Sequence, residues 1–289
     1  MATAELIGLK LHPVKACRRV EVREATVSAA GLVGDREWQV FSDEGKVLTQ
    51  RQHPALALVQ PELIGGGLRL SAPGHGTIEL ERPARADRVV TALLGDRVEV
   101  GDCGDEAAGW FSALTGTECR LVALCTPDAR RLELVSAQAM NFADATPVLV
   151  ANEASLRDLA RRAVEPFGMD RFRANLVVDG VEPWDEDTWA SFTIGEARLE
   201  TVIPVPRCTV PQVDQDTGKR HKEPARALRA HRWCTGAPSL PDGWQRFFNG
   251  QPLFGIGTTI APVGTLVRVG DPVEVLSTVA PLIAPPTPA

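Results

Sequence analysis

Hydrophobic and polar positions alternate in short runs along the first hundred residues, a pattern typical of β-strands. The runs are residues 6–11, 18–27, 37–43, 46–50, 56–63, 67–73, 76–81 and 96–102. Turn residues such as Asp43-Glu44-Gly45 and Pro73-Gly74-His75-Gly76 separate them. Regular short strands with turns between them predict a sheet or barrel in this part of the chain.

Helical spacing appears later and in few places. The pattern predicts helices over Asp105–Leu114, Asn152–Phe167 and Glu223–His231. Asn152 can cap the second helix, and a proline suits the first turn of the third. Strands are expected again over residues 147–151, 174–180, 191–195, 197–205, 264–271 and 272–276. The expected fold class is therefore α+β and β-rich, with a few helices.

The chain is long enough for two domains. We place the division near residues 117–124, between the first predicted helix and the next strand. The predicted domains are residues 1–120, a β-barrel-like unit, and residues 121–278. Residues 279–289 form a proline-rich tail that we expect to be frayed.

Charge and hydropathy exclude several classes of partner. The net charge is −6, which gives no general electrostatic footprint for nucleic acid. No apolar run reaches transmembrane length, and the first ten residues lack the pattern of a signal peptide. We expect a cytoplasmic protein that binds neither nucleic acid nor membrane.

Cysteine usage directs attention to one position. None of the six cysteines belongs to a CxxC pair, and their spacing gives no zinc or iron–sulfur pattern. Cys208 follows the strand over residues 197–205 and enters a loop with two prolines. The neighbouring Arg207 favours a thiolate, which is a soft metal ligand. The alternative is a buried structural cysteine.

Basic residues at strand borders give a second clue. Lys15, Arg36, Arg51 and Arg173 all lie in loops, where together they could bind an anion such as phosphate. Taken singly, each is also consistent with a solvated surface charge. Asp214 begins an acidic turn and is either a turn acceptor or a group that moves a proton.

Several motifs in order resemble one family. Residues 12–17, 31–38 and 48–54 resemble the N-terminal β-barrel domain of MOSC proteins. Residues 172–175, 207–208, 214–218 and 222–224 resemble the MOSC domain itself, and residues 252–255 and 269–273 resemble its closing strands. The resemblance covers nearly the whole chain and is strongest to the amidoxime-reducing components and their bacterial counterparts.

The resemblance implies a molybdenum cofactor of the molybdopterin type, with the metal bound by Cys208. It implies pterin and phosphate contacts at Lys15, Arg36, Thr146, Arg173, Asn175 and Arg207. The implied activity is a molybdenum-dependent oxidoreductase that removes oxygen from N-hydroxylated or N-oxide small molecules, with Asp214 as a candidate proton group. Electrons would come from a separate ferredoxin or flavoprotein.

This chain departs from the family pattern at three places. Ala16 and Pro206 replace serines, and residues 211–215 replace a Thr-Thr-Val-Asp-Pro run after the metal cysteine. The first two changes remove possible hydrogen bonds to the cofactor, and the third alters the floor of the site. Two alternatives stay open: a specialised pathway enzyme on the same fold, for example one that transfers sulfur through Cys208, and a molybdenum cofactor carrier.

Overall fold

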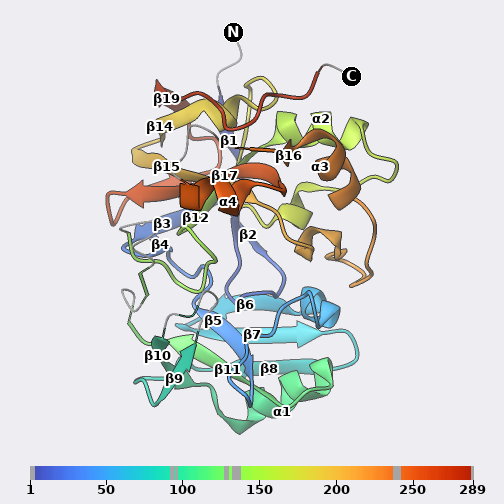
Figure 1. Ribbon diagram of the computed structural model, residues 1–289. Helices are drawn as coiled ribbons and strands as arrows, with labels where there is room; N and C mark the ends of the chain where they lie inside the picture. Colours follow the sequence, from blue (N-terminus) through green and yellow to red (C-terminus); the bar gives the residue numbers. More distant parts are fainter. Residues whose placement is uncertain are drawn as a thin grey trace.

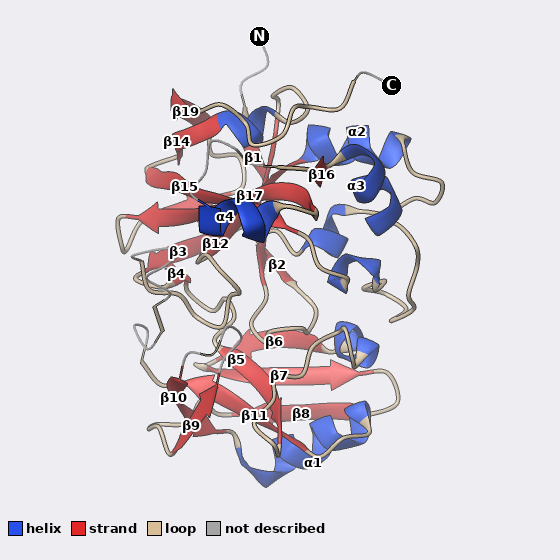
Figure 2. Ribbon diagram, in the orientation of Figure 1, coloured by secondary structure: helices blue, strands red, loops and turns tan. Residues whose placement is uncertain are grey.

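The computed structural model describes residues 4–91, 95, 97–126, 130–131, 138–236 and 242–287. Strands dominate, and four α-helices occur among these residues, so the predicted β-rich α+β class is confirmed. Figure 1 and Figure 2 show two bodies stacked along the long axis of the molecule, with both described chain ends at the top of the upper body.

The lower body contains two small antiparallel sheets and one helix. One sheet has the order β5 (Trp38–Ser42), β11 (Cys119–Leu124), β10 (Arg97–Asp102) and β9 (Arg88–Thr91). The other consists of β6 (Gln60–Ile64), β7 (Gly67–Ala72) and β8 (Gly76–Leu80). Helix α1 (Gly104–Thr115) covers their base, and Phe111 of α1 is buried in one core with Trp38 and Leu68.

The upper body is built on a nine-stranded sheet. Its order is β19 (Val273–Thr278), β14 (Trp189–Ile194), β15 (Ala197–Pro206), β17 (Gln251–Ala261), β12 (Val148–Asn152), β13 (Leu176–Asp179), β1 (Glu5–Leu11) and β2 (Val20–Val22), with β16 (Trp233–Cys234) beside β17. A further small sheet contains β18 (Leu266–Arg268), β3 (Glu24–Ser28) and β4 (Gly31–Leu32). Helices α2 (Glu153–Arg161), α3 (Ala225–His231) and α4 (Asp242–Phe248) lie around the sheet.

The two ends of the chain share the upper sheet. Strand β1 pairs with β13 in antiparallel register, with Glu5 opposite Asp179 and Leu9 opposite Leu176. Leu6 and Leu9 of β1 belong to the same buried cluster as Leu176 and Ile256. Strands from before and after residue 120 thus form one sheet, and the sheets alone do not divide the chain at that residue. The domain boundary near residue 120 stays a prediction.

Local predictions differ from the structure at several elements. Helix α2 begins after Asn152, whose side chain accepts a hydrogen bond from Ala154 N, as expected of a cap. The helix ends at Arg161, not Phe167, and Pro166 disfavours helical backbone in the residue before it. Residues 46–50 form no strand, and a 3-10 turn over Pro54–Leu58 precedes β6. Strands β9 and β16 and helix α4 were not predicted, and of β17 only residues 252–255 were expected as a strand, from the family resemblance.

The proline-rich segment after β19 packs against the fold, so the prediction of a frayed tail was wrong for its described part. Leu282 and Ile283 pack against a core cluster that contains Phe248 and Leu253. Arg162 donates a hydrogen bond to the carbonyl of Thr287 at 2.7 Å. Among the described residues, no helix has both the length and the apolar content needed to span a membrane.

Candidate cofactor and substrate site

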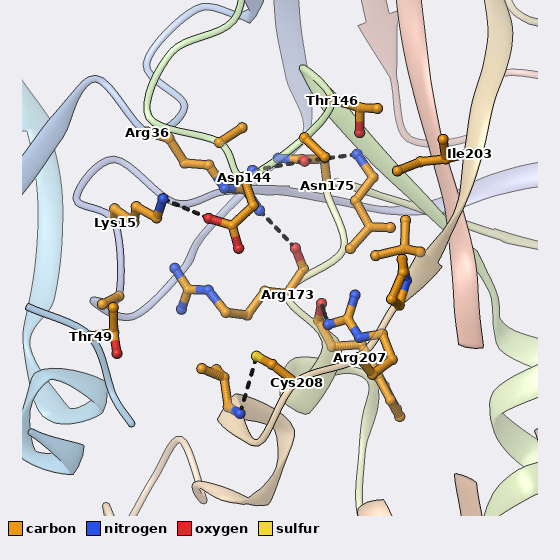
Figure 3. Close-up of a pocket in the computed structure, with 18 of the residues that line it drawn as sticks. Lys15, Arg36, Thr49, Asp144, Thr146, Arg173, Asn175, Ile203, Arg207 and Cys208 are labelled. Atoms are coloured by element: carbon orange, nitrogen blue, oxygen red, sulfur yellow. Dashed lines mark hydrogen bonds and ion pairs between the residues drawn. The ribbon is translucent and has the colours of Figure 1, made fainter. Parts of the chain in front are cut away.

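A cavity of about 620 Å³ receives residues from loops far apart in the sequence. Its lining includes all seven residues predicted to contact the cofactor or metal: Lys15, Arg36, Thr146, Arg173, Asn175, Arg207 and Cys208. Arg51, the other basic residue considered from sequence, also lines it. Figure 3 shows Lys15 and Arg36 on one side of the cavity and Ile203 and Arg207 on the other.

Strained backbone holds part of this wall. Ala16, Arg36 and Arg173 have φ values of 70°, 51° and 58°, in the left-handed region that favours glycine. Such a conformation costs a non-glycine residue about 1–2 kcal/mol. Three of the four non-glycine residues with positive φ among those described line the cavity, and strain of this kind gathers at functional sites.

Arg36 is fixed by the residues around it. Its guanidinium pairs with Asp35, donates to Asn175 Oδ1 at 2.9 Å and donates to the carbonyl of Arg173 at 3.1 Å. Asn175 is fully buried, and its amide nitrogen donates to the carbonyl of Lys10. Asn175 therefore positions Arg36 and the loop at Arg173, and its own polar atoms are occupied.

Arg173 and Arg207 keep buried donors without a protein acceptor. Arg173 Nη1 donates to the carbonyl of Cys17 at 2.6 Å, but its Nη2 has no partner. Arg207 Nη2 donates to the carbonyl of Phe172 at 2.6 Å, but its Nε has no partner. Burial, with repulsion from Arg36, lowers the pKa of Arg173 to about 10, and burial also lowers the pKa of Arg207. An anion bound here would accept hydrogen bonds from both unpaired nitrogens and would offset the free-energy cost of burying the two positive charges.

Lys15 has one anionic partner in the cavity wall. Its Nζ lies 2.6 Å from Asp144 Oδ1. Burial lowers the pKa of Lys15 even against the attraction of this carboxylate. Burial would raise the pKa of Asp144, but Lys15 and the nearby Arg36 and Arg130 outweigh it and hold that pKa at about 2. Asp144 is the only carboxylate among the described lining residues, so the wall is rich in positive charge.

Cys208 is exposed in this cavity, unlike the buried structural cysteine considered as an alternative. It follows the end of β15, and the backbone N–H of Val210 donates to its sulfur at 3.5 Å. A donor aimed at sulfur suits a thiolate ligand. Among the described cysteines, Cys17, Cys119 and Cys234 are buried, and burial raises the pKa of Cys17 to about 12.

Asp214 lies outside the set of described lining residues. Its carboxylate accepts hydrogen bonds from the backbone of Asp216 and Thr217 and pairs with Arg171 at 2.8 Å. Burial acts to raise its pKa, but these bonds to Thr217, Arg171 and Asp216 outweigh it, so the pKa is lowered. This arrangement favours the turn acceptor over the proton group, so we do not retain Asp214 in the site.

Sequence reasoning missed other residues of the lining. Asp144 lies two residues before the predicted Thr146 and could have been identified from that loop, whereas Trp244 and Phe247 of α4 belong to no motif. Gln50 belongs to the motif over residues 48–54, and no role was predicted for it. Its amide donates to the carbonyl of Ala16 at 2.6 Å and exchanges hydrogen bonds with Gln215, which ties the 211–215 loop to the N-terminal wall.

Comparison with known proteins assigns both parts of the chain. The MOSC N-terminal β-barrel domain matches residues 3–118, and the MOSC domain matches residues 137–274. Mitochondrial amidoxime reducing component 2 of Rattus norvegicus is 35% identical over 279 residues, covering 91% of this chain and 80% of the relative. Mitochondrial amidoxime-reducing component 1 of Mus musculus is 34% identical, covering 93% and 81%.

A third relative is a much longer protein. The molybdenum cofactor sulfurase of Danio rerio is 31% identical over 251 residues, which cover 78% of this chain but 30% of the relative. The alignments to the two amidoxime-reducing components, by contrast, cover most of this chain and most of each relative. The chain belongs to the family of MOSC-domain proteins that carry the MOSC N-terminal β-barrel domain and include the mitochondrial amidoxime-reducing components.

Proposed function

We propose that this protein is a molybdenum-cofactor-dependent reductase of N-hydroxylated or N-oxide small molecules. The observation that carries the proposal is one cavity in which an exposed cysteine meets two arginines that each have a buried donor nitrogen without a partner. The names of the relatives support it, since two are amidoxime-reducing components and one is a molybdenum cofactor sulfurase.

The chemistry of the cavity fits the proposed cofactor. A thiolate is a suitable ligand for a covalent metal centre, and Cys208 is exposed where it can bind one. The free Nη2 of Arg173 and the free Nε of Arg207 suit phosphate oxygens, which accept charge-assisted hydrogen bonds. Lys15 adds a further cation to the lining of the same cavity.

When bound, the molybdenum centre would supply a two-electron reduction that breaks the N–O bond and, with two protons, releases the oxygen as water. The protein's part is to bind and orient. Cys208 would hold the metal, while Arg173, Arg207 and Lys15 would fix the phosphate. Arg36 acts through the carbonyl of Arg173 and so keeps that loop in its strained conformation. The two electrons would come from a separate redox protein.

Replacing the metal ligand tests the proposal. In a host that makes the cofactor, we expect Cys208→Ser to abolish benzamidoxime reduction with a chemical reductant and to deplete molybdenum strongly. A hydroxyl is a harder, largely protonated ligand. The melting temperature of the cofactor-free protein should barely change, because the side chain is exposed and the swap is nearly isosteric. Elemental analysis and turnover are measured on the same sample.

Cys125→Ser is the matched control. Cys125 lies outside the described lining and already donates to the carbonyl of Pro83, so a hydroxyl there keeps a partner and both readouts should stay at the wild-type level. Full molybdenum and full turnover in Cys208→Ser would refute the assignment. Wild-type protein that binds molybdenum without turnover would indicate a carrier. A persulfide on Cys208 without molybdenum would indicate sulfur transfer.

A further inference from the structure

The cavity has a second wall whose chemistry differs from that of the cationic one. Apart from the cations, its lining includes the apolar residues Leu149, Ile203, Val205, Val210, Trp244 and Phe247. In Figure 3, Ile203 lies across the view from Lys15, with Arg207 on the same side as Ile203, and Cys208 lies below Lys15 and Ile203 in the view. A ligand that reaches Cys208 therefore has Lys15 and Arg36 on one side and, on the other, apolar surface with the single guanidinium of Arg207 beside it.

Helix α4 supplies the two aromatic side chains of this apolar wall. Phe248 of the same helix is buried with Ile203 and Leu253, which anchors α4 on the sheet. The Trp244 ring stacks on Phe248 with centroids 5.9 Å apart, and Phe247 meets Trp244 edge-on at 5.7 Å. The helix is thus fixed by one aromatic residue while the other two face the cavity.

Phe247 remains unusually open for a large apolar side chain. It lines the cavity and is 49% exposed. Covering such a ring by a flat apolar group is favourable, and aromatic pairs gain further from stacked or edge-on contact. No carboxylate lies beside Phe247 to attract a cation. Asp144 is the only carboxylate among the described lining residues, and it pairs with Lys15. The apolar wall therefore suits a neutral ring and not a cationic group.

We propose that α4 is the specificity element of this site, with Trp244 and Phe247 binding an aryl or similarly flat, neutral group of the substrate. The reducible N–O group then lies toward Cys208. This inference rests on the proposed reductase function and narrows it: N-hydroxylated aryl compounds are preferred over small aliphatic or positively charged ones.

The test compares benzamidoxime with acetamidoxime, which lacks the ring. Their dissociation constants are measured by calorimetry on the oxidised, molybdenum-loaded protein, where no turnover occurs, and KM and kcat are then measured with a chemical reductant. We expect the wild type to bind benzamidoxime about tenfold more tightly. Phe247→Ala should reduce that preference about tenfold, through Kd and KM more than through kcat.

Two further variants separate ring recognition from a general packing effect. Phe247→Leu keeps apolar surface and should retain part of the preference. Leu276→Ala removes an apolar side chain of β19 that is 45% exposed and outside the described lining, so it should leave the preference unchanged. Molybdenum content is measured for each variant, so that cofactor loss is not mistaken for altered recognition.

The outcomes distinguish this inference from the function on which it rests. If the wild type reduces both compounds but Phe247→Ala keeps the full preference, the role of α4 is refuted and the reductase stands. If benzamidoxime binds in a Phe247-dependent manner but neither compound is reduced, the reductase is refuted and aryl recognition stands. Equal wild-type affinity for the two compounds would also overturn the inference.

Discussion

At the scale of single residues, the site contains positively charged side chains in surroundings that disfavour their charge. Arg173 has a left-handed backbone, and burial together with the neighbouring Arg36 lowers the pKa of its guanidinium. One of its terminal nitrogens donates a hydrogen bond to the carbonyl of Cys17, and the other has no partner. A protein gains nothing from such an arrangement by itself, so the strain and the unpaired donor indicate a residue shaped for a ligand.

Arg173→Ala should therefore lower cofactor occupancy and leave the fold intact. The loss of a charge-assisted contact costs roughly 1.5–3 kcal/mol, which reduces affinity by about tenfold or more. Molybdenum content at limiting cofactor measures the change. Arg157→Ala is the control, because Arg157 pairs with Asp179 at an exposed position outside the described lining. Equal occupancy in Arg173→Ala and wild type would show that this guanidinium does not bind the cofactor.

At the scale of elements, alternation and capping were readable from the sequence where one face of a strand is buried. Strand β1 alternates, and Asn152 caps α2 as expected. The hydrophobic pattern did not reveal β17, because this strand is buried almost throughout and glycines interrupt it, so no period appears. Helix α4 is too short for a clear periodic signal, and its position is fixed by the contacts of Phe248 with residues distant in sequence. The basic residues in loops suggested a shared anion site, but only the family resemblance placed the remaining site residues with them, since sequence spacing carries no distances.

Gly257 in β17 shows what that glycine pattern serves. A Cβ at this position would lie 2.5 Å from Thr146 Oγ1, and no left-handed φ is involved, so only space is at issue. Gly257→Ala should destabilise the protein by roughly 1–3 kcal/mol through overpacking. It should also lower molybdenum occupancy, because Thr146 lines the cavity. Thermal unfolding and elemental analysis measure the two effects.

Gly109→Ala provides the comparison within the same chain. Gly109 lies in α1, and a Cβ there would meet nothing within 4 Å, so alanine should be neutral or stabilise by about 0.5–1 kcal/mol. In the double variant Gly257→Ala, Thr146→Ala, part of the destabilisation should be recovered, because the two closest atoms are removed. Equal stability of Gly257→Ala and wild type would show that β17 can shift away from Thr146.

At the scale of the whole molecule, the two bodies meet around one site. Lys15 and Arg36 reach the cavity from loops that follow β1 and β4, whereas Arg207 and Cys208 reach it from the end of β15. The bridge between Val14 and Trp38 and the hydrogen bond from Gln50 to Ala16 connect the N-terminal loop to the lower body. A cofactor bound there would contact segments from both halves of the sequence and should stabilise them together.

Whether the protein can take electrons directly from NADH is a question for the whole sequence. Its six cysteines have no iron–sulfur spacing, and it contains no GxGxxG fingerprint for a dinucleotide. The molybdenum-loaded protein alone should therefore not oxidise NADH when benzamidoxime is added. Reduction should begin when reduced methyl viologen is supplied, or a ferredoxin with its reductase, because these deliver electrons without a nicotinamide site on this chain. Absorbance at 340 nm and benzamidine formation follow the two reactions. NADH oxidation by the isolated protein that depends on benzamidoxime would contradict the need for a separate donor.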